Sequence, residues 1–266
     1  MGIRKHDEYA KKLKRRNIVF YDSKFGRENI TREVPSFDFV ESRFGVKLHP
    51  SSLVIDVGCG TASNLLSLNC NEKVALDISS VNLTLARERS SKLMLVQADA
   101  EYIPFRERVF DVVLMVDLLH HVPNPDAAIK EVNRILRRGG QLFVWDACID
   151  GVKPIYPVAM FIEKISEKIG NCIENLGPSR YQTVKWLEQN DFKILKGFGE
   201  GSFIRYMDSV LECFFKRFGT ALPYHLRRVL IMIESKVEHS FSKNFPLKLG
   251  IIATNSSALL GMEPLL

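Results

Sequence analysis

Residues 54–64, VIDVGCGTASN, place one acid and two glycines at the end of a short apolar run. Asp56 lies two positions before Gly58, and Gly60 follows Gly58 after a single residue. Glycine at such a place permits a tight turn and lets backbone amides approach a ligand closely. An acid beside the turn would repel a pyrophosphate but attract an ammonium or sulfonium group. The loop therefore favours a ligand that carries positive charge at this end.

The glycine spacing argues against a dinucleotide site. A dinucleotide-binding loop of the form GxGxxG requires a third glycine at the position that Ser63 occupies. Without that glycine the pyrophosphate interpretation is weakened. The remaining alternative for a glycine pair is an ordinary turn between a strand and a helix.

Two more acids follow later apolar runs. Asp77 lies 21 residues after Asp56, at a place where an acid can accept both hydroxyls of a ribose. Asp99, between Ala98 and Ala100, follows the third run, where a carboxylate can accept a hydrogen bond from an adenine amino group. Alone, each acid reads as a surface residue or a helix cap. Three acids at successive strand ends beside a glycine loop together predict a nucleoside site.

Strand and helix patterns alternate between residues 52 and 148. Five apolar runs predict strands at 52–58, 73–79, 93–99, 110–119 and 141–147. Apolar strands separated by helix-length segments indicate a parallel sheet that is covered on both faces.

The helix before the fifth strand has clear boundaries in the sequence. Asn124 can cap it, Pro125 suits its first turn, and Gly139 is predicted to end it after Arg137 and Arg138 in the last turn.

The later part of the chain is predicted to contain further helices and two strands. The predicted helices are 155–169, 181–192, 203–218 and about 224–240, and the predicted strands are 192–198 and 247–255.

The segments VIDVGCGTASN, LDIS, QADAEYIPF, FDVVLMVDLLHHV and EVNRILRRGGQLFV together resemble the class I S-adenosylmethionine-dependent methyltransferases. The resemblance is strongest to the branch that methylates quinones, small metabolites and lipids. It covers residues 50–148 well and the two later strands loosely. It implies an α/β fold, a Rossmann-like seven-stranded, mostly parallel sheet with helices on both faces. The last strand, 247–255, would be antiparallel, with a helical insertion before it.

The resemblance implies that the glycine loop binds the methionine end of S-adenosyl-L-methionine. Asp56, Gly58, Cys59 and Gly60 would make these contacts. Many members of the family have a third glycine where this chain has Ala62. Because alanine is small, we expect the turn to be preserved.

The resemblance also implies contacts to the nucleoside end of the cofactor. Asp77 would hold the ribose hydroxyls, and Ile78 would pack on the adenine. Asp99 and Ala100 would read the adenine edge.

The fourth strand should end near the reactive methyl group, where the family implies that Asp117 and Leu118 line the cofactor. Methyl transfer is an in-line displacement, so a base is needed only for a nucleophile that starts protonated. His120 and His121 are candidates for that base or for a substrate contact; the alternative is that they shape the loop. Asp146, at the end of the fifth strand, is another candidate substrate contact.

The N-terminal arm is strongly basic. Residues 1–16 hold seven Lys or Arg against Asp7 and Glu8, which is a net charge of +5 out of +6 for the whole chain. The arm either contacts nucleic acid or anionic lipid, or is a solvated first helix. Within residues 1–45, which we expect to form a helical arm or lid, Tyr21 is either a lid residue near the cofactor or a core aromatic.

Composition sets further limits. The hydrophobic fraction of 46% and the charged fraction of 26% are ordinary for a globular protein. No run reaches the roughly 18 apolar residues that span a bilayer, and the charged N-terminus does not resemble a secretory signal. The five cysteines form no CxxC pair, which argues against a disulfide framework or a zinc site and suits a cytoplasmic protein without a metal.

We expect residues 46–266 to form the methyltransferase domain, with helical segments at about 151–180 and 199–246 that recognise the acceptor. Both segments are rich in large apolar residues. They would cap a pocket for an isoprenoid or aromatic substrate, lie at a membrane interface beside their Lys and Arg residues, or simply extend the core. The sequence makes no prediction of the oligomeric state.

The predicted function is methylation of a small-molecule or lipid-like acceptor by an enzyme that is cytoplasmic or peripheral to a membrane. The alternative is a tRNA or other RNA methyltransferase that uses the basic arm. The nearly neutral remainder of the chain and the lack of an RNA-binding module disfavour nucleic acid as the partner. The intact acids disfavour a non-catalytic scaffold, and the absent third glycine disfavours a nicotinamide dehydrogenase.

Overall fold

The structure is a computed structural model of the 266-residue chain. It describes residues 8, 11–12, 14–15, 18–19, 48–157, 159–161, 164, 177–200, 211, 223–226, 228–229, 232 and 248–255. The chain divides into two compact units: residues 1–144, 185–196 and 251–266 form the first, and residues 145–184 and 197–250 form the second.

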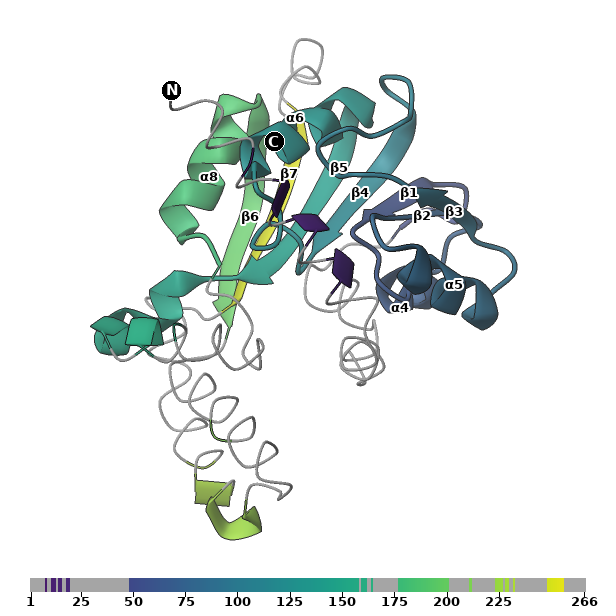
Figure 1. Ribbon diagram of the computed structural model, residues 1–266. Coiled ribbons are helices and arrows are strands. Elements are labelled where there is room, and N and C mark those ends of the chain that lie inside the picture. The colour runs from purple at the N-terminus through teal and green to yellow at the C-terminus, as the bar shows by residue number, and fades with distance from the viewer. Residues whose placement is uncertain are drawn as a thin grey trace. The chain divides into compact units, whose positions relative to one another are not determined.

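Seven strands form one mostly parallel sheet in the order β3-β2-β1-β4-β5-β7-β6, with an antiparallel hairpin at one edge (Figure 1). The strands are β1 (Leu53–Val57), β2 (Glu72–Asp77), β3 (Met94–Gln97), β4 (Phe110–Val116), β5 (Leu136–Ala147), β6 (Phe192–Glu200) and β7 (Lys248–Asn255). The helices are α4 (Ser63–Ser67), α5 (Ser80–Arg89), α6 (Pro125–Ile135) and α8 (Arg180–Gln189), with a 3₁₀ helix η1 (Ile149–Ile155). The predicted Rossmann-like, seven-stranded fold class is confirmed.

Strand β1 is the buried centre of the first unit. Ile55 is paired with Val74 of β2 on one side and with Val113 of β4 on the other, both in parallel register. Ile55 and Val113 have no exposed surface, and Val74 is 2% exposed. Fully burying one such side chain stabilises a fold by roughly 1.5–3 kcal/mol, so the end of β1 is firmly held.

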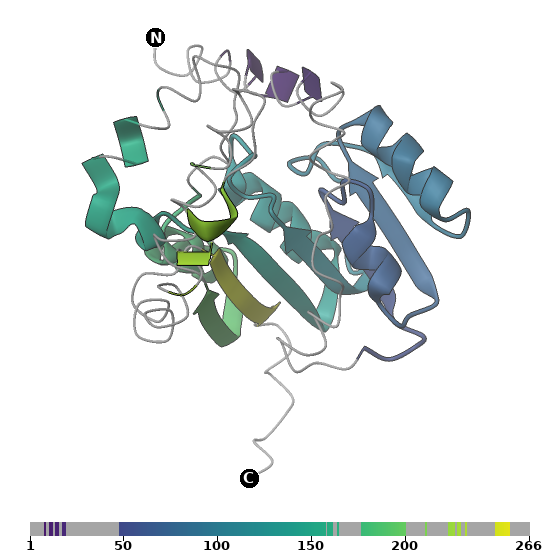
Figure 2. The ribbon, with the colours of Figure 1, turned by 90° about the horizontal axis from the view of Figure 1, so that it is seen from below.

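Helices α4 and α5 lie beside strands β1, β2 and β3, as both ribbon views show (Figures 1 and 2). Helix α5 begins after Ser79, whose hydroxyl accepts a hydrogen bond from the Asn82 amide at 3.1 Å. This cap fixes where the chain turns after β2, because it satisfies an amide that the first helical turn leaves without a partner.

Helix α6 begins where the sequence predicts. The Asn124 side chain accepts a hydrogen bond from the Ala127 amide at 3.2 Å, and Pro125 occupies the first helical position. The apolar face that the spacing predicts is fully buried and consists of Ala128, Ile129, Val132 and Ile135.

The predicted end of α6 is wrong. Arg137 and Arg138 were expected in its last turn, with Gly139 as the terminator, but the helix ends at Ile135 and residues 136–140 already belong to β5. Leu136 has extended backbone angles, φ −76° and ψ 134°. Strand β5 therefore begins five residues before the predicted 141.

The reason lies at the other end of the chain. The Asn255 side chain of β7 accepts a hydrogen bond from the Gly139 amide at 2.9 Å and donates to the Arg137 carbonyl at 2.9 Å and to the Leu136 carbonyl at 3.4 Å. The Thr254 hydroxyl donates to the Gly140 carbonyl at 2.9 Å. These partners, more than 110 residues away in sequence, stabilise an extended segment that local spacing assigns to a helix.

The later predictions are only partly within the described residues. Helix α8 and strands β6 and β7 agree with the predicted 181–192, 192–198 and 247–255. The predicted helix at 155–169 is preceded by η1 and has helical residues at 156–157, 159–161 and 164, while its other positions lie outside the described residues. Most of the predicted helices 203–218 and 224–240 lie outside them as well.

We predict that Asn255→Ala lowers the free energy of unfolding by about 2 kcal/mol, because the Leu136 and Arg137 carbonyls and the Gly139 amide lose their hydrogen-bond partner. Urea denaturation measures this loss. The matched control is Asn71→Ala at an exposed position, which we expect to change stability by less than about 0.5 kcal/mol. Equal losses in the two variants would contradict the role assigned to Asn255.

Candidate functional site

The loop after β1 makes its turn with left-handed backbone angles at three positions. The φ angles are +77° at Gly58, +52° at Gly60 and +57° at Ala62. Ala62 is fully buried and precedes the first residue of α4. A left-handed alanine is strained by roughly 1–2 kcal/mol, which explains why glycine would suit this position.

Hydrogen bonds hold the loop against the end of β2. The amides of Gly58 and Cys59 both donate to the Leu76 carbonyl, at 2.8 and 3.0 Å. The Gly60 amide donates to Oδ2 of Asp77 at 2.8 Å. The loop geometry is therefore set by backbone contacts to the neighbouring strand.

Gly58 also contacts the end of β4. A Cβ atom at this position would lie 2.7 Å from Cδ1 of Leu118. The residue would also have to adopt the left-handed backbone conformation of Gly58, which residues with side chains rarely adopt. The glycine thus brings the loop after β1 and the residue after β4 into close packing. The two predicted cofactor residues Gly58 and Leu118 are neighbours in the structure.

Asp56 has an unsatisfied buried carboxylate. Its exposed fraction is zero, and neither carboxylate oxygen has a hydrogen-bond partner among the described residues. Burial, and to a smaller degree the charge of Asp77, raises the pKa of Asp56 to about 7. A cationic donor placed here would satisfy the carboxylate and remove the penalty of its burial.

Asp77 is buried too, but it has partners. In addition to the Gly60 amide, its carboxylate accepts hydrogen bonds from the Ser79 amide at 2.8 Å and from Nδ2 of Asn82 at 3.3 Å. Burial raises the pKa of Asp77, and these donors oppose the shift. Asp77 thus has an organising role for the loops after β1 and β2.

The Cys59 thiol is not activated. Burial raises the pKa of Cys59 well above its usual value, and the nearby charges of Asp77 and Asp56 add to the shift. A thiol in such surroundings stays protonated, so Cys59 can line a ligand but is not a nucleophile.

The ends of β2 and β3 are joined in the same way. The Ala98 amide donates to the Asp77 carbonyl at 3.1 Å, and Nε2 of Gln97 donates to the Ile78 carbonyl at 3.2 Å. Asp99 follows directly and accepts a hydrogen bond from the Glu101 amide at 3.0 Å. The predicted residues of the nucleoside end therefore lie on two loops that are bonded to each other.

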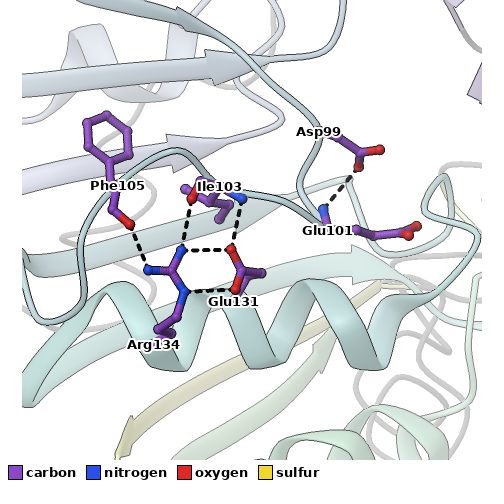
Figure 3. A network of polar contacts seen from close by, with 6 residues as sticks. All are labelled: Asp99, Glu101, Ile103, Phe105, Glu131 and Arg134. Carbon is purple, nitrogen blue, oxygen red and sulfur yellow. Dashed lines mark hydrogen bonds and ion pairs between the residues drawn. The ribbon is translucent and has the colours of Figure 1, made fainter.

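A network of polar contacts fixes the loop after β3 onto α6, and Figure 3 shows its members. Arg134 donates to the carbonyls of Phe105 at 2.6 Å and Ile103 at 2.8 Å, and it pairs with Glu131 at 2.7 Å. Glu131 accepts a hydrogen bond from the Ile103 amide at 2.9 Å. The hydrogen bond to Arg134 is the largest cause that lowers the pKa of Glu131.

His120 and His121 contact each other just beyond β4. Their ring centroids are 3.8 Å apart with the planes inclined by 45°, and the His121 amide donates to the Leu118 carbonyl at 2.9 Å. A carboxylate oxygen of Asp117 lies within 4.8 Å of a ring nitrogen of His120. Asp117 itself has a left-handed φ of +50°.

Two other predicted residues are not among the described residues of the first unit. Tyr21 lies outside the described residues. Asp146 belongs to the second unit, where it is 2% exposed and accepts a hydrogen bond from the Ala147 amide at 2.7 Å.

The sequence prediction missed several residues that position the site. Arg89, at the end of α5, donates to the Thr61 hydroxyl at 2.9 Å and so supports the glycine loop. Glu131 and Arg134 have the i, i+3 spacing of a helical ion pair, which is a recognisable signal. Their contacts to the loop after β3, and the contact of Arg89 to Thr61, join residues that are 28 to 31 positions apart and leave no local pattern.

Comparison with known proteins finds methyltransferases among the relatives. Residues 55–144 match the family described as a methyltransferase domain. An uncharacterized protein of Methanocaldococcus jannaschii is 28% identical over 95% of this chain and 90% of its own length. The demethylmenaquinone methyltransferase of Staphylococcus haemolyticus is 30% identical over 53% of this chain and 61% of its own length.

A second kind of relative is also similar. The mouse protein named probable tRNA methyltransferase 9B is 33% identical over 36% of this chain and 22% of its own length. Among solved structures, geranyl diphosphate methyltransferase in complex with S-adenosylmethionine superposes with a TM-score of 0.57 at 14% identity, covering 82% of this chain and 83% of that one. This last likeness shows the fold alone. The chain spans only part of the length of the relatives that are named for a reaction.

The protein has an α/β fold, and the side chains at its strand ends suit a nucleoside-containing ligand with a cationic end. The chain carries a methyltransferase domain at residues 55–144 and shares its fold with S-adenosylmethionine-dependent methyltransferases, whose cofactor is S-adenosyl-L-methionine. The site fits this cofactor, because the buried Asp56 carboxylate lacks a partner and the cofactor carries an ammonium group.

We predict that Asp56→Asn makes the cofactor-free protein more stable than the wild type at pH 8. The folded wild type holds the Asp56 proton up to about pH 7, whereas the unfolded chain loses it near pH 3.8, so wild-type stability falls as the pH rises between these values. Asparagine does not ionise and avoids this loss, which amounts to at most about 4 kcal/mol for a pKa shift of about three units.

Urea denaturation from pH 5 to pH 8 measures the effect. The stability difference between variant and wild type should grow with pH, whereas the control Glu72→Gln, at an exposed carboxylate, should show no such trend. A difference that stays constant with pH would show that Asp56 is not a buried, titrating acid.

Proposed function

We propose that this methyltransferase transfers a methyl group from S-adenosylmethionine to a small-molecule or lipid-like acceptor. The observation that carries the cofactor half of the proposal is the buried, unpartnered Asp56 carboxylate at the end of β1. In the proposal, Asp56 binds the ammonium group of the methionine moiety. Gly58, Cys59 and Gly60 provide the close backbone surface along it.

The nucleoside half of the cofactor would be bound by the next two strand ends. Asp77 would bind the ribose, because its three protein donors leave about one of the four lone-pair positions of the carboxylate for a ribose hydroxyl. Ile78 would pack on the adenine, and Asp99 with the buried Ala100 would read its edge. Leu118, packed on Gly58, and Asp117 would line the cofactor from β4.

The cofactor supplies an activated methyl group on a sulfonium, so the protein's main task is to align the nucleophile and exclude water. Where the acceptor is a phenol or hydroxyl, its proton must be removed. We assign that step to His120. Its ring contacts the His121 ring, and one of its ring nitrogens lies within 4.8 Å of a carboxylate oxygen of Asp117.

The small-molecule or lipid-like acceptor is supported by the quinone methyltransferases among the relatives. It is also supported by apolar side chains of the second unit: Tyr224, Val229 and Met232 are 75%, 46% and 52% exposed. Such side chains beside Arg228 suit an apolar acceptor or peripheral contact with a membrane. Within the described residues, no helix is both long enough and apolar enough to span a bilayer.

RNA is the second candidate acceptor. It is supported by the tRNA methyltransferase relatives and by Lys11, Lys12 and Arg15, which are exposed on the N-terminal arm. Against it, Lys14 of the same arm is bound to two carboxylates and is less available to a phosphate backbone. The lipid-like acceptor is therefore favoured.

We predict that Asp56→Asn lowers the affinity for S-adenosylmethionine by 10- to 100-fold, the equivalent of roughly 1.5–3 kcal/mol for a charged hydrogen bond. The affinity for methylthioadenosine, which lacks the amino-acid group, should remain within about twofold. Asp77→Asn should weaken both ligands, since both contain the ribose. Titration calorimetry with thermal melting as a control for folding gives these values. An equal loss of both ligands in Asp56→Asn would refute the ammonium contact.

The acceptor class can be tested with methyl-labelled S-adenosylmethionine and a cell extract that is separated into lipid, small-molecule, RNA and protein fractions. We expect label in the lipid or small-molecule fraction, and much less with Asp56→Asn at the same subsaturating cofactor concentration. Label in RNA would establish the second candidate. RNA binding would then weaken steeply with salt and with replacement of Lys11 and Lys12.

A further inference from the structure

Lys14 is set apart from the other described cations of the N-terminal arm. Lys11, Lys12 and Arg15 are exposed, whereas the Lys14 side chain is only 21% exposed. Its ammonium lies 2.6 Å from Oδ2 of Asp99 and 2.9 Å from Oε2 of Glu101. It also lies 5.7 Å from the centroid of the Tyr102 ring, within the range of a cation–π contact.

The two acids hold Lys14 in its charged form. Burial is the largest single influence and lowers the pKa of Lys14. The hydrogen bonds and charges of Asp99 and Glu101 together raise the pKa by more than burial lowers it, so the net shift is upward. A lysine with three donor hydrogens can bind both carboxylates at once. The Lys14 ammonium group thus forms ion pairs with the Asp99 and Glu101 carboxylates at the same time.

Both acids belong to the loop that the proposed function assigns to the adenine. Asp99 is held from its other side by the Glu101 amide, which donates to Oδ1 at 3.0 Å, as Figure 3 shows. The second oxygen of Glu101 accepts a hydrogen bond from the Asn124 amide at 3.2 Å, at the start of α6. Lys14 therefore connects the arm to a loop that is already anchored on α6.

An ionised carboxylate has about four lone-pair positions. Among the described residues, Lys14 occupies one position on Oδ2 of Asp99 and the Glu101 amide occupies one on Oδ1. Each oxygen keeps one position that can accept from a ligand. Lys14 thus leaves Asp99 able to bind an amino group, while it fixes the orientation of the carboxylate.

We propose that Lys14 is a positioning residue for base recognition: it holds Asp99 in place so that the cofactor site selects adenine through its 6-amino group. This inference rests on the proposed function, because it requires a cofactor with a purine base at Asp99. It gives one cation of the basic arm a role in small-ligand specificity. Lys14 acts through Asp99 and does not touch the reacting atoms.

The test compares S-adenosylhomocysteine with S-inosylhomocysteine, in which an oxygen replaces the 6-amino group. Wild type should bind the adenine compound at least tenfold more tightly, because the inosine oxygen faces a carboxylate. Lys14→Met should weaken the adenine compound five- to tenfold and leave the inosine compound within twofold, so that the discrimination is largely lost. Lys14→Arg should restore most of it, since arginine keeps the charge.

The matched control is Lys12→Met, an exposed cation two positions away on the same arm, which should change neither affinity. Asp99→Asn should lose the same discrimination, and adding Lys14→Met to it should have little further effect if the two residues act as one unit. Thermal melting confirms that the variants are folded.

The possible failures can be told apart. If wild type binds neither compound, the proposed cofactor is wrong and this inference falls with it. If wild type discriminates and Lys14→Met discriminates equally well, or loses both ligands to the same extent, only the role of Lys14 is overturned. An equal loss would show that Lys14 supports the arm and not the orientation of Asp99.

Discussion

Two buried carboxylates at adjacent strand ends, Asp56 and Asp77, set the constraint on which the rest of the site depends. Burying an ionised carboxylate is unfavourable unless donors or a cation compensate for it. Asp77 has donors from the loops after β1 and β2. Asp56 has none among the described residues, and it shares the negative potential of Asp77. The β1 end is therefore built for a partner that brings positive charge.

The same constraint explains why the surrounding loops are held mainly by backbone hydrogen bonds. The amides of Gly58, Cys59 and Gly60 all point to the β2 end, which requires left-handed angles at the two glycines. Gly58 must also lack a side chain because Leu118 packs against it. A rigid, preorganised surface of this kind lowers the entropy lost when a ligand binds.

The sequence predicted the parts of the fold that depend on local patterns. Fully apolar runs predicted the five parallel strands, and Asn124 with Pro125 predicted the start of α6. The end of α6 was wrong because Asn255 and Thr254, from the last strand, stabilise an extended conformation at residues 136–140. The sequence near Leu136 does not reveal these contacts, because Thr254 and Asn255 lie more than 110 residues away.

The same division applies to the site. Asp56, Gly58, Gly60 and Asp77 were predicted as site residues from their spacing and from the family resemblance, and the structure places them close together. The residues that hold them, such as Arg89 and Arg134, act across loops that are distant in sequence. A helical pattern shows only that such a side chain is polar, not which carbonyl or hydroxyl it binds.

The cofactor end and the acceptor end follow different physical rules. Strand ends of the first unit form the proposed cofactor site, and the relatives are named for a quinone in one case and a tRNA in another. The common fold therefore does not determine the acceptor. Net charge alone does not determine it either, because Lys14 is neutralised by Asp99 and Glu101 within the protein. The cations that remain exposed on the arm, and not its formal charge of +5, define what it can offer to a phosphate backbone.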